Sequence, residues 1–348
     1  MSKKARITLA LILVLVALAN IGIFYKMSYN KTTPTGERIV IRLGHTVGDT
    51  HPIHQASVMF EEELERLSNN RFDVRVYPNA ALGGDRQQTE SMILGYIQAN
   101  IPPTSVLAGF DERFMVVDLP FIFKTTEAAV NTLNGELGEE LDPILESLGI
   151  HTMGWTSSGF RHITTNDIEV TSPKNLENVS IRTQENPIHL ASFRAWGASP
   201  TPMAFSELFT ALQQGAVAAQ ENPVLVTVSN RLFEVQNTLS LTGHFFTAGN
   251  FAFNKDFYDS LEGQDKAWLE EAGENFVDNL TRLVTEQDED FIQQAEDNGM
   301  KIIRLTPEQK DEFIQSASSV YDLFIDEYGG SQELIDKAML YNDESTED

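Results

Sequence analysis

An alternation of strand-like and helix-like segments in the first third of the chain constrains the fold more than any other feature. Residues 38–43 (RIVIRL) and 72–77 (FDVRVY) alternate apolar and polar side chains, which is typical of half-buried strands. Between them, apolar positions such as Ile53 and Phe60 recur at helical spacing, and a second helix is expected to end near Gly95. The order strand, helix, strand, helix predicts an α/β lobe with a largely parallel sheet.

The rest of the chain continues this mixture of elements. Residues 116–123 (VVDLPFIF) are apolar but contain Pro120, so we expect a core loop rather than a central strand. Residues 157–159 (SSG) are expected to form a turn, and Thr306 is expected to cap a final helix. The other helices are expected at residues 127–133, 137–148 and 264–297, and the other strands at residues 151–156, 246–253 and 301–305.

Length and charge limit the class of protein and its partners. The length of 348 residues fits two lobes better than one, because single hydrophobic cores stop growing at ~250–300 residues. The chain has 51 acidic and 25 basic residues. Such a surface repels nucleic acid and anionic lipid headgroups, so we expect neither as a partner. It also repels anionic ligands at long range, so an anion site has to be a locally positive pocket.

Missing residue types and motifs exclude several chemistries. The chain has no cysteine, which excludes disulfides, thiol catalysis and cysteine-based zinc sites. It has no HExxH motif and no GxSxG elbow, and the His51–His54 pair lacks the acidic partners of a zinc enzyme. We therefore expect no metal and no cofactor. A hydrolase or isomerase that uses an Asp/Glu pair stays open, because acidic pairs are everywhere in this chain.

The N-terminus has the pattern of an export signal. Three basic residues precede an apolar run at residues 7–19, and residues 17–19 (ALA) fit a cleavage site. The alternative is an uncleaved membrane anchor, because residues 21–25 (IGIFY) extend the apolar run toward the ~20 residues that span a bilayer. We expect residues 1–35 to be a signal peptide or an N-terminal membrane anchor with a linker, followed by an extracytoplasmic body.

Residues 179–223 carry the strongest indication of a ligand site. Arg182 ends a short alternating run, on the face opposite Val179 and Ile181, and its planar guanidinium is suited to clamp a carboxylate. On spacing alone, an ordinary surface arginine is the alternative interpretation. The residues that follow are expected to form a helix, a proline-bracketed turn, a second helix, a short strand and a Gln-Glu-Asn-Pro turn. The pattern favours capture of an anion, because no nucleophile, metal cluster or phosphate loop accompanies the arginine.

Neighbouring polar residues are candidates for the same cleft. Arg161 directly follows the turn expected at residues 157–159, and open α/β sheets place ligands at loops that follow strands. A surface arginine is again the alternative. Asn222 precedes Pro223, which disfavours a helix there, so its side chain either caps the next helix or donates to a ligand oxygen. Glu221 fits a structural role better, because a carboxylate opposes an anionic ligand.

A series of short motifs is distributed along residues 38–340. They are Leu43-Gly44-His45, Asp49-Thr50-His51-Pro52, Tyr77-Pro78-Asn79, Leu82-Gly83-Gly84-Asp85-Arg86, Asp118-Leu119-Pro120-Phe121-Ile122-Phe123, Gly159-Phe160-Arg161-His162, Ile181-Arg182, Gly197-Ala198-Ser199-Pro200-Thr201-Pro202, Phe205-Ser206-Glu207-Leu208-Phe209, Ala211-Leu212-Gln213, Gln220-Glu221-Asn222-Pro223, Glu234-Val235-Gln236 and Thr242-Gly243-His244. In this order and spacing, the motifs resemble the DctP-type substrate-binding proteins of TRAP (tripartite ATP-independent periplasmic) transporters. No single motif is decisive, but together they make the resemblance strong.

The resemblance implies a fold and its lobes. The expected fold is an α/β, two-lobed periplasmic binding protein fold, with a ligand cleft between lobes that are joined by crossing strands and a long helix. The strands are expected to cross near Gly159 and Ala248. The expected parts are residues 36–159 and 248–287 for the first lobe, residues 160–247 and 288–340 for the second lobe, and residues 341–348 for an acidic tail.

The resemblance also implies which residues line the cleft. The carboxylate-clamping arginine of the family falls on Arg182, its second arginine on Arg161 and its cleft asparagine on Asn222. Aromatic packing around the ligand falls on Phe205. With two residues from neighbouring motifs added, the expected substrate-binding residues are Arg182, Arg161, Asn222, Phe205, Glu221 and His45.

The chain departs from the family pattern where the distal end of the ligand is expected. The aspartate usual two residues before the Gln-Glu-Asn-Pro motif is Ala218, and the acid usual after Gly-x-Ile is Gln98. Residues 99–104 (ANIPPT) carry two prolines where the family often lines the cleft. The sequence therefore does not distinguish a sugar acid from a C4-dicarboxylate.

The implied function is that of an extracytoplasmic solute-binding protein and not of an enzyme. It captures a small organic acid in the periplasm, a sugar acid such as a hexuronate or a C4-dicarboxylate, and delivers it to the small and large TRAP membrane subunits. A monomer is expected, as is usual for the family. The alternatives are a membrane-tethered ligand sensor that uses the same cleft and a periplasmic hydrolase or isomerase.

Overall fold

The computed structural model describes residues 38–342 of the chain. The signal or anchor segment expected at residues 1–35 lies outside the described residues, as does nearly all of the acidic tail expected at residues 341–348. Within the described part, no helix combines the length and the apolar character needed to cross a membrane.

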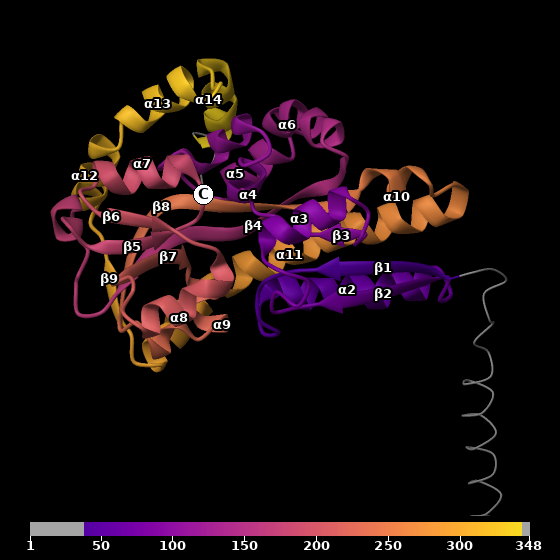
Figure 1. Ribbon diagram of the computed structural model, residues 1–348, viewed down its shortest axis with the longest axis horizontal. Helices are drawn as coiled ribbons and strands as arrows, with labels where there is room; N and C mark the ends of the chain where they lie inside the picture. Colours follow the sequence, from indigo (N-terminus) through magenta and orange to yellow (C-terminus); the bar gives the residue numbers. More distant parts are fainter. Residues whose placement is uncertain (1–37, 343–348) are drawn as a thin grey trace, which may run out of the picture.

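One mixed β-sheet runs through the described part of the chain, with helices packed on both faces (Figure 1). Its strand order is β2-β1-β3-β8-β4-β7-β5-β6, and β9 pairs with β8. The strands are β1 (Ile39–Gly44), β2 (Phe72–Tyr77), β3 (Ala99–Asn100), β4 (Ile150–Thr165), β5 (Ser180–Thr183), β6 (Ser199–Pro202), β7 (Ala219–Pro223), β8 (Thr238–Asn254) and β9 (Lys301–Arg304).

The parallel part of the sheet follows from the alternation at the start of the body. β1 pairs in parallel with both β2 and β3, and α2 (Pro52–Leu67) forms the crossover from β1 to β2. Ile41 and Leu43 of β1 and Phe60 of α2 are buried, because a period of two in a strand and a helical period each place apolar residues on one face. The predicted α/β lobe is confirmed.

Two long antiparallel strands join the halves of the molecule. β4 and β8 pair along most of their length. β8 pairs with β3 at one end and with β9 at the other, while the later part of β4 pairs with β7. α11 (Gly263–Asp297) packs along β4 (Figure 1). This arrangement confirms the two-lobed fold with crossing strands and a long helix, and the lobe boundaries stay a prediction.

The turn expected at residues 157–159 is instead a bulge inside β4. The pairing of β4 with β8 shifts between Ser157 and Gly159 and then continues to Thr165. Gly159 has a φ of +85°, which glycine adopts without steric cost, so the irregularity is accommodated without ending the strand. The strand expected at residues 151–156 is only the first part of β4.

Two turns expected in residues 179–223 are strands. The proline-bracketed segment is β6, which pairs in parallel with β5 at the edge of the sheet, where proline is tolerated. The Gln-Glu-Asn-Pro segment belongs to β7, which pairs with β4 and β5. The two predicted helices are present as α7 (Pro187–Ala195) and α8 (Leu208–Gln213). The difference matters because a strand fixes alternate side chains on defined faces.

The other helices agree with prediction except at the C-terminal end. α5 (Thr126–Leu133), α6 (Glu136–Ser147) and α11 begin and end within one residue of the expected bounds. Thr306 caps a helix as expected, but two further helices follow it. The remaining helices are α3 (Asp85–Ile93), α4 (Thr104–Leu107), α9 (Val224–Ser229), α10 (Lys255–Asp259), α12 (Pro307–Ser316), α13 (Ser319–Glu327) and α14 (Gln332–Met339).

Candidate functional site

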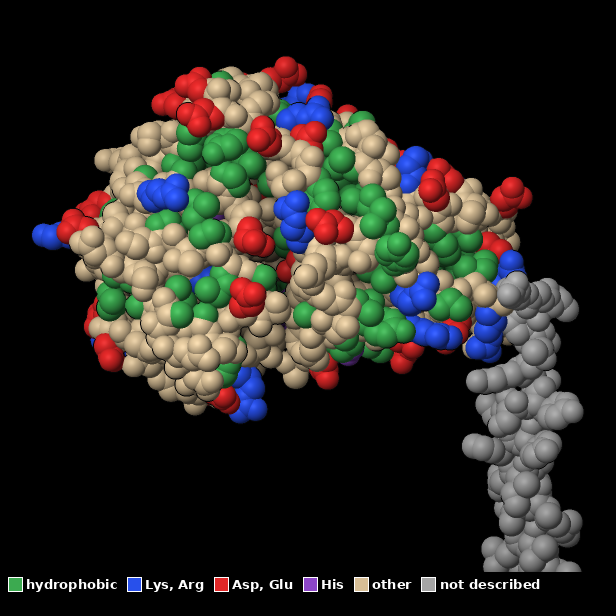
Figure 2. Space-filling model, viewed as in Figure 1, with side chains coloured by type: hydrophobic (Ala, Val, Ile, Leu, Met, Phe, Trp, Pro, Cys, Tyr) green, Lys and Arg blue, Asp and Glu red, His purple; other side chains and the backbone are tan. Residues whose placement is uncertain are grey.

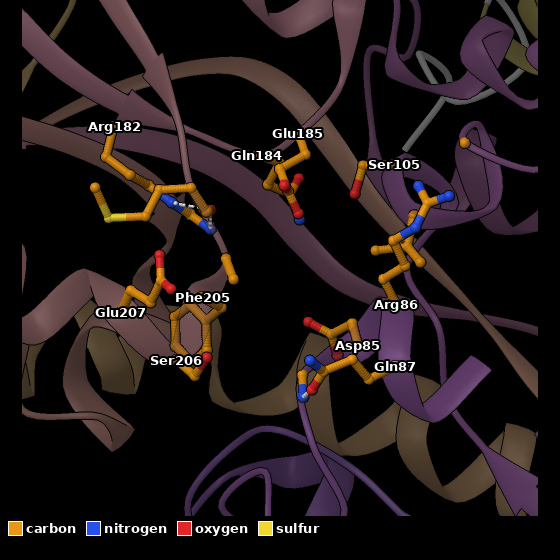
Figure 3. Close-up of a pocket in the computed structure, with 15 residues that line it drawn as sticks. Asp85, Arg86, Gln87, Ser105, Arg182, Gln184, Glu185, Phe205, Ser206 and Glu207 are labelled. Carbon is orange, nitrogen blue, oxygen red and sulfur yellow. Dashed lines mark hydrogen bonds between the residues drawn. The ribbon is translucent and has the colours of Figure 1, made fainter. Parts of the chain in front are cut away.

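A cavity of about 320 Å³ opens where the start of α3 faces the end of β5, and we call it the outer chamber. Figure 3 shows Arg182 and Phe205 on one side of it and Asp85, Arg86 and Gln87 on the other. In the space-filling view, a hollow separates the two halves of the molecule on this face (Figure 2). Segments far apart in the sequence therefore share one cleft.

A second cavity of about 70 Å³ adjoins the first, and we call it the inner chamber. Asp85, Gln184 and Phe205 line both chambers. The inner chamber is also lined by His45, which directly follows β1, and by Arg161 from β4. The two chambers form a continuous lining that runs from the rim to the central strands.

Arg182 places a buried guanidinium at the wall of the outer chamber, and no carboxylate of the described residues is in contact with it. Only 2% of the residue is exposed. Its Nε and Nη2 donate to the backbone oxygen of Met203 at 3.0 and 2.7 Å. Among residues 38–342, its Nη1 has no hydrogen-bond partner. Burial lowers the pKa of Arg182 to about 10, so the group is still charged at neutral pH.

The other buried arginine, Arg161, is neutralised by Glu221. Arg161 in β4 and Glu221 in β7 are neighbours because the two strands pair antiparallel. The Nε of Arg161 donates to Oε2 of Glu221 at 2.5 Å and its Nη2 donates to Oε1 at 2.9 Å, a two-point salt bridge. Its Nη2 also donates to Oδ1 of Asn222, and its Nη1 donates to Oγ1 of Thr247, both at 3.0 Å. Arg161 therefore shapes the inner chamber with most of its donors in use.

Glu221 lies behind the cleft and lines neither chamber. Burial alone would raise its pKa, but Arg161 and a hydrogen bond from His244 hold the pKa of Glu221 well below its usual range. Burial lowers the pKa of His244 to about 4. The ring of His244 is therefore neutral. Its Nε2 lies 3.3 Å from Oε2 of Glu221, and its Nδ1 lies 2.6 Å from the Thr242 hydroxyl. Within the expected site, Glu221 serves as the counter-ion of Arg161.

Two histidines of the inner chamber are uncharged. Burial and the neighbouring His54 lower the pKa of His45 to about 4, and Nε2 of His45 lies 3.1 Å from Nδ1 of His54. Burial, with a smaller effect of His45, lowers the pKa of His51 to about 3. The Nδ1 of His51 accepts the backbone N–H of Ile53 at 3.0 Å and caps α2. Both rings offer hydrogen-bonding groups without charge.

Asn222 does not cap the helix that follows it. Its Nδ2 donates to Oε1 of Gln220 at 2.5 Å, and its Oδ1 accepts from Arg161. The N-cap of α9 is Pro223, which makes no side-chain cap bond. The capping interpretation is therefore wrong, and the Asn222 side chain lines the inner chamber.

The outer chamber carries more acidic than basic groups. Asp85 at the start of α3 accepts the Thr46 hydroxyl at 2.8 Å, and burial raises the pKa of Asp85. Glu185 and Glu207 are exposed at the rim. Among residues 38–342, no group of three or more His, Asp or Glu side chains is placed to hold a metal ion.

Two of the three departures from the family pattern lie outside both chambers. Gln98 accepts hydrogen bonds from the backbone N–H and the Nε of Arg42, and Ala218 is exposed. By contrast, Ile101 and Pro103 line the inner chamber. Of these departures, only the segment at residues 99–104 therefore lines one of the chambers.

All the expected residues except Glu221 line the two chambers, and other residues line them too. Sequence reasoning missed the roles of Asp85, Gln184 and Ser158 as lining residues. Gln184 follows Arg182 by two residues, and this spacing places both on one side of an extended chain. The glycines before Asp85 indicated a helix start, which is where a buried carboxylate finds donors.

Two lobes with a cleft between them, and at its wall a buried arginine whose Nη1 has no hydrogen-bond partner among residues 38–342, are the features expected of a binding protein. The sequence model of the DctP family, described as bacterial extracellular solute-binding protein, family 7, matches residues 43–327. The chain belongs to this family, which confirms the identification made from the motifs. The family is extracytoplasmic and its members bind solutes for transport, so non-enzymatic binding is shown at the level of the family.

Relatives and solved structures agree with this assignment. A solute-binding protein of Verminephrobacter eiseniae is 35% identical over 245 residues, which cover 70% of this chain and 73% of the relative. The C4-dicarboxylate-binding periplasmic protein DctP of Rhodobacter capsulatus is 33% identical over 264 residues, which cover 76% and 79%. The sugar acid binding protein DctPAm of Advenella mimigardefordensis, solved with galactonate, has a TM-score of 0.85 at 27% identity, covering 88% of this chain and 99% of that chain.

Proposed function

We propose that this protein captures a small organic acid through a salt bridge between the ligand carboxylate and Arg182 and delivers it to the small and large membrane subunits of a TRAP transporter. The observation that carries the proposal is the buried Nη1 of Arg182, which has no partner among residues 38–342. A carboxylate supplies both the missing acceptor and the missing negative charge.

Neighbouring groups complete the binding of the acid. Arg161 and Asn222 add polar contacts but little net charge, because Arg161 is already paired with Glu221. Charge-assisted hydrogen bonds contribute ~1.5–3 kcal/mol each, so two or three supply much of the ~8 kcal/mol of a micromolar site. Packing on Phe205 adds to this, offset by the ordering of ligand and side chains.

The names of similar proteins support an acid as the ligand. One relative is named for C4-dicarboxylates, and one solved structure holds galactonate. Both kinds of molecule carry the carboxylate that Arg182 is placed to clamp. The same anchoring therefore serves for either ligand class.

Capture requires the two lobes to close over the ligand. A ligand held between Arg182 and Asp85 stabilises the closed state, because it binds that state better than the open one. The hinge lies near Gly159 and Ala248, where β4 and β8 cross between the halves. The closed periplasmic monomer is then the form that the membrane subunits recognise.

Calorimetry on matched variants tests the clamp. A thermal-shift screen of hexuronates, aldonates and C4-dicarboxylates first finds a binding acid, since ligand raises the melting temperature. Arg182→Gln is then compared with Arg194→Gln, which removes the same charge from an exposed site on α7. We expect the first to weaken binding by ~30-fold, or about 2 kcal/mol, and the second to bind normally. A folded Arg182→Gln protein with unchanged affinity would refute the clamp.

Delivery is tested in proteoliposomes that contain TRAP membrane subunits and a sodium gradient. We expect a labelled acid to accumulate only when this protein is added. Chemical change of the acid on incubation with the protein alone would favour the hydrolase or isomerase. Uptake that does not depend on the protein would favour the tethered sensor.

A further inference from the structure

One residue that lines the inner chamber carries a buried hydrogen-bond donor without an acceptor among the described residues. His51 is fully buried and lines the chamber. Because its Nδ1 accepts the backbone N–H of Ile53 at 3.0 Å, the proton of the neutral ring must be on Nε2. Among residues 38–342, that Nε2 has no hydrogen-bond partner. A buried donor without an acceptor is costly, and a ligand oxygen in the chamber removes this cost.

The charges around the inner chamber decide which kind of oxygen fits. Burial keeps both histidines neutral, because it lowers the pKa of His45 to about 4 and the pKa of His51 to about 3. The charge of Arg161 is matched by the two-point salt bridge with Glu221. Asp85 contributes a carboxyl at the boundary with the outer chamber. A ligand carboxylate at this depth would lose its hydration next to another acid, and this costs more than burying an uncharged hydroxyl.

The other polar groups of the inner chamber suit hydroxyls as well. Ser158, Gln184 and Thr247 are uncharged, and each can donate and accept. A hydroxyl needs both kinds of partner, whereas a carboxylate needs donors only. This makes the chamber chemically matched to a polyol chain.

The rim of the outer chamber opposes a second carboxylate too. Glu185 and Glu207 are exposed there (Figure 3). The other cation of the rim, Arg86, already donates to Glu90 at 3.0 Å and lies 5.4 Å from the ring centre of Phe110. Arg182 is therefore the cation best placed to hold an anion, and it suffices for a single carboxylate.

We propose that the inner chamber is a subsite for an uncharged, hydroxyl-bearing chain, with the Nε2–H of His51 as the donor to a ligand hydroxyl. The cleft accordingly takes a polyhydroxylated monocarboxylate in preference to a dicarboxylate. This inference rests on the proposed function, since Arg182 must hold the single carboxylate.

Calorimetry with acids of equal chain length tests the ligand class. Galactonate and gluconate carry one carboxylate and a hydroxylated chain, galactarate and glucarate have carboxylates at both ends, and hexanoate lacks hydroxyls. We expect the tightest hydroxylated monocarboxylate to bind at least ~10-fold more tightly than its dicarboxylate and than hexanoate.

The outcomes separate this inference from the proposed function. If galactarate, glucarate or succinate binds more tightly than every monocarboxylate, the inference is overturned, while loss of that binding in Arg182→Gln still supports the clamp. If neither these acids nor any hexuronate or C4-dicarboxylate of the thermal-shift screen binds, the proposed function itself fails.

A variant of His51 tests the donor. His51→Asn keeps a side-chain oxygen at the N-cap of α2 and removes the ring Nε2–H. We expect ~5- to 10-fold weaker binding of the preferred hydroxylated acid at a nearly unchanged melting temperature. Ser331→Ala removes an N-cap acceptor from α14, which contributes no residue to either chamber, and controls for a lost cap. Wild-type affinity in a folded His51→Asn protein overturns the assignment.

Discussion

Two buried arginines lie in strands of one sheet, but only one of them is matched by a carboxylate. Arg161 is held by Glu221 in a two-point salt bridge, whereas Arg182 donates to a backbone oxygen and keeps its Nη1 free among the described residues. A buried charge is costly unless it is paired. The partners of the two side chains, and not their burial, therefore distinguish the proposed ligand clamp from a structural pair.

Glu221→Gln should destabilise the protein strongly. The change leaves the charge of Arg161 buried without its carboxylate, and breaking a buried pair in this way costs ~3–5 kcal/mol. Urea unfolding measures the loss. The control is Glu286→Gln, which breaks an exposed pair with Arg282 on α11 and should cost less than ~1 kcal/mol. Equal losses in both variants would contradict the role of Glu221.

Buried histidines should make the protein sensitive to acid. Burial lowers the pKa of His51 and His162 to about 3, and of His45 and His244 to about 4, from 6.5. Below pH ~6.5 the unfolded chain binds protons that the folded chain rejects, so stability is lost as the pH falls toward ~4.

The free energy of unfolding should fall by at least ~3 kcal/mol between pH ~7 and ~5, measured by urea unfolding at both values. The pKa of Asp142 is raised to about 6, mainly by burial, and this opposes the trend without reversing it. Stability that is flat or rises on acidification would contradict the prediction.

The bulge in β4 shows how one strand sets the shape of the site. Ser158 and Arg161 are an odd number of residues apart, so a regular strand would point them to opposite faces. Both line the inner chamber, and the pairing of β4 with β8 shifts between Ser157 and Gly159, at Ser158 itself. β7 then lies between β4 and β5 and brings Glu221 next to Arg161.

Gly159→Ala should cost stability and weaken binding. At a φ of +85°, an added Cβ meets only a side-chain methyl of Val284 at 3.9 Å, so the cost is backbone strain of ~1–2 kcal/mol. Gly299→Ala, at a φ of +90° with open space around it, should lose similar stability in urea unfolding. Calorimetry should show weaker acid binding only for Gly159→Ala, because only that change moves Ser158 relative to Arg161. Equal affinities in the two variants would refute the link.

The molecule as a whole repels the kind of ligand that we propose it binds. The chain carries a formal net charge of −26, while the attraction at Arg182 is local and buried. Salt screens long-range repulsion within a Debye length of ~8 Å at physiological ionic strength, compared with ~30 Å at 0.01 M. A buried contact pair is screened much less.

The association rate of the acid should therefore rise with salt. We expect an increase of about three- to tenfold between ~0.01 and ~0.15 M NaCl, with a much smaller change in the dissociation rate. Stopped-flow fluorescence or ligand competition measures both rates. A fall in the association rate would show that the local field of the cleft outweighs the net charge.

The spacing of apolar residues was sufficient to predict those helices and strands whose buried face is marked in their own sequence. The α/β start of the body and the long helix α11 were expected within a residue or two, because apolar spacing reports directly which face of an element is buried. Residues 157–159, 199–202 and 220–223 were expected as turns, since serine, glycine, proline and asparagine favour turns locally. They are parts of strands because their pairing partners lie elsewhere in the chain.

Charge balance, motif order and local periodicity identified the fold class, the family and Arg182 as the candidate clamp. All three signals depend only on the order of residues along the chain. They did not reveal that Glu221 neutralises Arg161, that Asn222 leaves α9 uncapped or that Nε2 of the chamber residue His51 has no hydrogen-bond partner among the described residues. Those outcomes depend on which atoms meet when distant strands pair. In a buried cleft, it is the presence or absence of such a partner that turns a polar side chain into a structural support or a ligand contact.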